Sequence, residues 1–134
     1  MNFNSILIGS ENPDALVAYY ARLFGDPTWN EGGYTGWLIG SGAVTIGPHS
    51  EVHGTNPSPG RIIWNIESPD VQADFARFRE AGAIVIREPY TFEGEDGHIA
   101  TLADPDGNYF QLMSPMPAEM GDAAKASTAS PGTR

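Results

Sequence analysis

The sequence predicts an α+β protein built from two β-α-β-β-β repeats, and three observations support this prediction. Two amphipathic helices begin on similar tripeptides, Asn-Pro-Asp at 12–14 and Ser-Pro-Asp at 68–70, whose prolines are 56 residues apart. An apolar, strand-like run comes directly before each helix. Several strand-like segments follow each helix without a further helix between them, which favours hairpins. An α+β sandwich without internal repeats is the alternative.

The two helices have clear starts, ends and buried faces. A capping residue followed by proline and aspartate is typical of a helix N-terminus. Apolar residues then recur at the spacing of one buried helix face. Gly25 and Gly82 are placed to end the helices. The predicted buried residues are Leu16, Tyr19, Tyr20, Leu23 and Phe24 in the first helix and Val71, Phe75 and Phe78 in the second.

The expected strands are short and are separated by turns. Ser41-Gly42 and the Asp-Pro-Asp-Gly at 104–107 supply two of these turns. The predicted strands are 5–9, 36–39 and 43–47 in the first repeat, and 61–66, 84–87, 99–103 and 108–113 in the second.

By its size, the chain of 134 residues is expected to form one domain. That domain covers residues 1–116, with repeats at about 3–50 and 60–115 and a linker at 48–60. Residues 117–134 contain no aromatic residue and no apolar period, so we expect a flexible or loosely packed tail there.

The charge and composition exclude several functions. Seven basic and 17 acidic residues give a net charge of −10, all of it within residues 1–116. Such a body repels phosphate backbones and anionic lipids, so we expect neither nucleic acid nor membrane partners. The chain has no cysteine, which excludes disulfides and thiolate chemistry and is compatible with a cytoplasmic location. The apolar run at 6–8 is too short for a signal or membrane-spanning segment.

The segment 102–112, Leu-Ala-Asp-Pro-Asp-Gly-Asn-Tyr-Phe-Gln-Leu, resembles the vicinal oxygen chelate superfamily, which includes glyoxalase I, extradiol dioxygenases and bleomycin- and fosfomycin-resistance proteins. The second repeat of that superfamily typically carries Asp-Pro-Asp-Gly-Asn, two further residues and Glu-Leu, and here Gln111 replaces the Glu. The first helix, with its Tyr19-Tyr20 pair and Leu-Phe-Gly end, is also similar. The resemblance covers about residues 3–115. It implies the glyoxalase/bleomycin-resistance fold, in which two repeats form a cupped mixed sheet, and typically a homodimer.

The superfamily usually holds a divalent metal in the cup, on the first and last strands of each repeat. Carrying these positions over by spacing places them at Ser5, Ile46, Arg61 and Gln111. Arginine cannot ligate a metal, isoleucine has no lone pair, and serine is a poor ligand. We therefore expect no divalent metal and no other cofactor.

Polar and aromatic residues on the cup face are the candidates for binding a ligand. Arg61 is suited to hold a carboxylate, a phosphate or a polarised carbonyl, and a structural ion pair is the alternative. Trp37 is equally compatible with a place in the core. The predicted ligand-binding residues are Arg61, Gln111, Tyr109, Asn65, Thr101, Ser5 and Trp37.

The histidines and the loop acids carry weaker signals. His49 and His53 flank Glu51 in a Pro/Gly-rich linker, where we expect solvated side chains. Alternation along its strand predicts that His98 points away from the cup. The acids at 93, 95 and 96 are expected to form a solvated loop.

The leading hypothesis is a protein that binds a small organic molecule in the cup without the family metal, as the superfamily's bleomycin-resistance-type members do. The alternative is a lyase, isomerase or dioxygenase of the same superfamily. It would use a metal if His49 or His53 swings into the cup, or no metal if Arg61 acts as electrophile and Tyr109 as acid. A regulatory module is a third possibility. The acidic body favours a cationic ligand and Arg61 an anionic one, so the ligand charge stays open.

Overall fold

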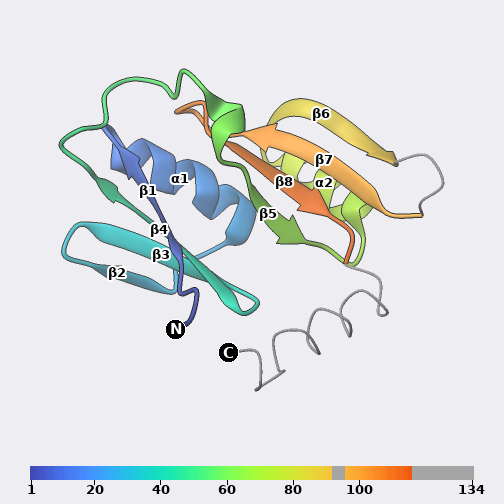
Figure 1. The fold of residues 1–134 in the computed structure, drawn as a ribbon, viewed down its shortest axis with the longest axis horizontal. Coiled ribbons are helices and arrows are strands. Elements are labelled where there is room, and N and C mark those ends of the chain that lie inside the picture. The colour runs from blue at the N-terminus through green and yellow to red at the C-terminus, as the bar shows by residue number, and fades with distance from the viewer. Residues whose placement is uncertain (92–95, 116–134) are drawn as a thin grey trace.

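The computed structural model describes residues 1–91 and 96–115, which form two β-α-β-β-β repeats in succession (Figure 1). The first repeat consists of β1 (Ile6–Ser10), α1 (Pro13–Phe24), β2 (Trp29–Glu31), β3 (Tyr34–Ile39) and β4 (Gly42–Pro48). The second consists of β5 (Trp64–Glu67), α2 (Val71–Glu80), β6 (Ile84–Thr91), β7 (His98–Ala103) and β8 (Tyr109–Met113). A short 3-10 turn, η1 (Pro59–Arg61), lies between the repeats. The tail predicted at 117–134 and the loop acids Glu93 and Glu95 lie outside the described residues.

Each repeat forms its own four-stranded mixed sheet. The strand order is β1-β4-β3-β2 in the first sheet and β5-β8-β7-β6 in the second. The first and last strands of each repeat pair in parallel, and the other neighbours pair antiparallel. The predicted α+β fold of two β-α-β-β-β repeats with mixed sheets is therefore confirmed.

Both helices cover the same side of the two sheets (Figure 1). One continuous apolar core lies between the helices and the sheets. The predicted buried faces of both helices are confirmed, with Phe24 at the edge of the core. Tyr20 of α1 reaches the second sheet, where its ring centroid lies 5.6 Å from that of Phe110 and 6.0 Å from that of Trp64. We call the sheet faces that are turned away from the helices the open face.

The start of α2 corrects the alignment of the two repeats. Asp70, rather than the predicted Ser68, caps α2, because Asp70 Oδ1 accepts the N–H of Ala73 at 3.0 Å. Pro13 is thus the first residue of α1, whereas Pro69 lies before the cap of α2. The helices begin two residues further apart than the prolines do. Within the described ranges, neither helix is long and apolar enough to cross a membrane.

The predicted strand at 61–66 begins later than expected. Pro59 fixes the first residue of η1, and the N–H of Arg61 donates to the carbonyl of Ser58 at 3.0 Å. Residues 59–61 therefore turn instead of extending, and β5 starts only at Trp64. The prediction that Arg61 lies on a strand, which was the basis for placing it on the cup face, is wrong. Arg61 is exposed at the end of the turn.

Candidate ligand-binding face

A row of polar side chains crosses the open face of the second sheet. Asn65 on β5 lies opposite Gln111 on β8, and Gln111 lies opposite Thr101 on β7, which lies opposite Arg87 on β6. Side chains paired across neighbouring strands point to the same face of a sheet. Gln111 Nε2 donates to Thr101 Oγ1 at 3.0 Å, in agreement with this register. Phe110, which precedes Gln111 on β8, packs in the core, so the row of polar side chains faces away from the helices.

The first sheet carries aromatic rings on its open face. The indole of Trp29 lies over Gly36, where an added Cβ would come within 2.1 Å of a ring carbon. The ring of Tyr34 lies over Gly47, where an added Cβ would also come within 2.1 Å of a ring carbon. The two glycines therefore let the rings lie flat against the strands.

The positions that the resemblance assigns to metal ligands do not fit a metal. With the repeats aligned by register, the four strands carry Leu7, Thr45, Asn65 and Gln111 at these positions. The predicted position Ile46 is wrong by one residue, because Ile46 packs in the core and is 1% exposed. Zinc, iron and manganese prefer imidazole and carboxylate ligands. Among the residues that the structure describes, no three His, Cys, Asp or Glu side chains lie close enough together to hold an ion.

A groove of about 580 Å³ lies between β1, the linker and the turn from β7 to β8. Leu7 lines it from the first sheet and Tyr109 from the second, and the exposed Ile62 extends its apolar wall. Asp106 and Asn108 form a polar end. Tyr109 is the predicted ligand-binding residue that this groove contains.

The remaining predicted site residues lie elsewhere. Trp37 is 2% exposed, and its indole N–H donates to a backbone carbonyl after α1 at 3.0 Å. Its assignment to the cup wall is wrong, because alternation along β3 places it on the helix side. Ser5 precedes β1, and its hydroxyl donates to the side chain of the preceding residue at 2.8 Å. Asn65, Thr101 and Gln111 come together in the polar row.

The histidines of the linker make local hydrogen bonds. His49 Nδ1 accepts the N–H of Glu51 at 3.2 Å, so this ring caps its own turn. His53 Nδ1 lies 3.1 Å from Glu11 Oε2, with both side chains mostly exposed. The hydrogen bond from His53 and another from the N–H of Gly54 lower the pKa of Glu11. The predicted solvated linker is in agreement with this arrangement.

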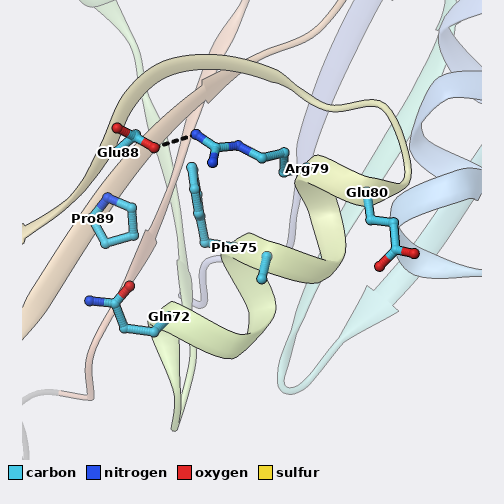
Figure 2. Close-up of a pocket in the computed structure, with 7 residues that line it drawn as sticks. Gln72, Phe75, Arg79, Glu80, Glu88 and Pro89 are labelled. Carbon is cyan, nitrogen blue, oxygen red and sulfur yellow. Dashed lines mark hydrogen bonds and ion pairs between the residues drawn. The ribbon is translucent and has the colours of Figure 1, made fainter.

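The adjacent residues Arg87 and Glu88 of β6 face opposite sides of the second sheet. Glu88 points toward α2 and forms an ion pair with Arg79, as Figure 2 shows. With Phe75 they line a groove of about 510 Å³ on the helix side. Arg87, the residue before Glu88, pairs with Thr101 and so faces the open side. The groove in Figure 2 is therefore separate from the polar row.

Arg87 is the candidate that the sequence reasoning missed. The register of β6 shifts between Val85 and Arg87 and again between Arg87 and Tyr90. Simple alternation from Val85, which packs against the core, would place Arg87 on the helix side. The extra residue of the bulge turns Arg87 to the open face instead. Pro89 is the one sequence signal, because proline within a strand marks an irregular edge.

The fold and the open face define the class of protein: two β-α-β-β-β repeats, with helices on one side and a potential binding surface on the other. A family described as a glyoxalase-like domain matches residues 5–113. The chain belongs to this family, within the vicinal oxygen chelate superfamily. An uncharacterized protein from Mycolicibacterium smegmatis is 28% identical over 113 residues, which cover 83% of this chain and 91% of the relative.

Solved structures share the fold. A glyoxalase/bleomycin resistance protein/dioxygenase family enzyme from Burkholderia phytofirmans is 20% identical, with a TM-score of 0.66 over 84% of this chain and 98% of its own. TioX from a Micromonospora species is 16% identical, with a TM-score of 0.68 over 87% of this chain and all of its own. A glyoxalase/bleomycin resistance protein from Catenulispora acidiphila is 19% identical, with a TM-score of 0.65 over 86% and 97%. Identities this low show the fold alone.

Proposed function

We propose that this protein binds a small organic molecule on its open face, without the divalent metal of its superfamily. The observation that carries the proposal is the polar row, in which the amides of Asn65 and Gln111 stand where metal ligands are expected and the hydroxyl of Thr101 lies beside them. Asn65 and Gln111 offer neutral donors and acceptors, which orient an organic ligand but do not hold an ion. The rings of Trp29, Tyr34 and Tyr109 add flat apolar surface for such a ligand.

The groove beside β1 supports the same proposal. Its volume of about 580 Å³ lies within the usual range for small-molecule sites, roughly 300–1,000 Å³. It combines apolar walls from Leu7, Ile62 and Tyr109 with a polar end at Asp106 and Asn108. A mixture of apolar surface and a few polar groups is typical of a pocket that binds an organic molecule.

The test is native mass spectrometry of untreated protein, followed by a thermal-shift screen with antibiotics and aromatic metabolites. We expect no stoichiometric metal and at least one compound that raises the melting temperature. Gln111→Leu should remove that shift, whereas Gln72→Leu, on the helix side, should retain it. One tightly bound metal per chain would instead support the alternative of a metal-dependent enzyme. If no compound raised the melting temperature, the binding proposal would be wrong.

We further propose that the protein is a homodimer whose second copy covers part of the open face. Leu38 supports this, because it is 60% exposed and lies next to the core residue Trp37 on the other face of β3. Leu7 of β1 lies on the same face as Leu38 and is 54% exposed, and exposed apolar residues that gather on one face are typical of an interaction site. Light scattering at micromolar concentration should give a mass of two chains for the wild type. Leu38→Asp should lower the measured mass toward that of one chain. A wild-type monomer would contradict the proposal.

A further inference from the structure

The open face of the second sheet contains one cationic side chain among the described residues, Arg87 of β6. The other arginines that the structure describes lie on the helices or, for Arg61, at the end of η1. The open-face acid of this sheet, Glu67, lies on β5 at the opposite edge. None of the ion pairs among the described residues involves Arg87. The charge of Arg87 is therefore not neutralised by a carboxylate in the part of the chain that the structure describes.

The guanidinium of Arg87 is held against an aromatic ring. Its central carbon lies 3.5 Å from the centroid of Tyr90, further along the same strand. Stacking fixes the plane of a guanidinium and leaves its N–H edge free to donate two parallel hydrogen bonds. A fork of this kind matches a carboxylate.

The surroundings of Arg87 define the rest of the ligand. Two strand spacings, about 10 Å in all, separate Arg87 from Gln111 across the sheet. Apolar side chains flank the polar row on both sides, namely Ile99 and Met113 on one side and Ala103 and Tyr109 on the other. Gln111 uses its Nε2 for Thr101, and its Oε1 accepts no hydrogen bond among the described residues.

We propose that the polar row binds a flat aromatic carboxylate, with the carboxylate on Arg87 and the ring system extending over Thr101 toward Gln111. This inference rests on the proposed function and adds the charge and shape of the ligand to it. The acidic body would by itself favour cations. Arg87 reverses that preference locally, because a bidentate, charge-assisted contact at short range is stronger than a diffuse field screened by salt.

The test compares 2-naphthoate with its neutral isostere 2-naphthamide by NMR titration of the whole protein at neutral pH. We expect 2-naphthoate to bind at least five-fold more tightly, with the largest shifts at Arg87, Thr101 and Gln111. Arg87→Gln should abolish the preference, Arg87→Lys should leave part of it, and the matched control Arg61→Gln should retain all of it. The amide spectrum of each variant reports whether it is folded.

The outcomes separate the two proposals. Equal affinity for the two compounds, or an unchanged preference in Arg87→Gln, would overturn the carboxylate inference while leaving small-molecule binding in place. Preferred binding of 2-naphthoate with shifts confined to the groove residues Leu7 and Ile62 would overturn the assigned position. Failure of the wild type to bind either compound would count against both proposals, and a positive thermal-shift screen would then show that the inference alone had failed.

Discussion

The hydroxyl of Tyr20 donates to Asp104 Oδ2 at 2.8 Å, which ties α1 of the first repeat to the β7–β8 turn of the second. Asp104 is 1% exposed and also accepts the backbone N–H groups of Asp106 and Asn108, at 2.9 and 3.0 Å. Burial raises the pKa of the Asp104 carboxyl, and it raises that of the Tyr20 hydroxyl well above its usual range. This contact holds the two repeats around one core, so it also sets how the two halves of the open face lie.

Tyr20→Phe should destabilise the protein by about 1–3 kcal/mol, because the buried Asp104 loses a donor that nothing replaces. Chemical denaturation of the variant and the wild type measures the difference. Tyr34→Phe is the matched control, since Tyr34 is 39% exposed, and its effect should stay within about 0.5 kcal/mol. Equal losses in the two variants would contradict a structural role for the Tyr20 contact.

Asp104→Asn should change how stability depends on pH. The native pKa of Asp104 is raised above the ordinary value of 3.8, so between the two values the folded state holds more proton than the unfolded state. Stability from this group is therefore greatest at low pH and falls as the pH rises through that window. Asparagine does not titrate, so the variant should lack this component.

Denaturation of both proteins between about pH 3.5 and pH 7 tests the prediction. The variant should also be less stable overall by about 1–3 kcal/mol. The N–H₂ of asparagine would face the Tyr20 hydroxyl and the Asn108 amide, which donate hydrogen bonds to the carboxylate of Asp104. A difference in stability that stayed constant over the whole pH range would show that Asp104 does not contribute in this way.

Gly36→Ala should displace Trp29 from the open face. The new Cβ would lie 2.1 Å from the indole, so the ring must move, and overpacking of this kind costs about 1–3 kcal/mol. The tryptophan fluorescence and the melting temperature should both change. Gly42→Ala is the control, because the closest contact of its Cβ is 3.7 Å. Similar effects of the two substitutions would contradict the placement of Trp29.

Gln111→Glu should fail to create a metal site, although it restores the carboxylate typical of the superfamily. The partner positions Leu7, Thr45 and Asn65 still supply no imidazole or carboxylate. Elemental analysis after dialysis against zinc or manganese should give less than about one tenth of an equivalent for the wild type and the variant. Stoichiometric metal in the variant would show that other side chains complete the site.

Local patterns were sufficient to predict the element order and the core. The spacing of Leu16, Tyr19 and Tyr20 indicates a helix face before any tertiary contact is known, and all three residues are buried. The Asp-Pro-Asp-Gly-Asn turn is equally local, because Asp104 accepts N–H groups within four residues of itself. Most of the candidate site followed too: alternation along β8 places Tyr109 and Gln111 on one face, away from the core residue Phe110.

The errors arose where one or two residues alter the phase of a strand. Alignment of the two prolines places Arg61 on a cup strand, but Pro59 starts a turn and β5 begins only at Trp64. Ile46 was displaced by one position, which exchanges the two faces of a strand. Trp37 faces the core because side chains alternate between the two faces along β3.

The sequence by itself determined that this chain forms two β-α-β-β-β repeats around one aromatic core, because helix caps, turns and apolar periods are local properties. Only the tertiary structure decided that Arg87 joins the predicted Asn65, Thr101 and Gln111 on the open face. The register between strands is set by pairing across the sheet, and a bulge adds a residue to one strand without a mark in its periodicity. That bulge in β6 is why Arg87 stands in one row with Thr101 and Gln111, whereas the turn at Pro59 keeps Arg61 off the sheet.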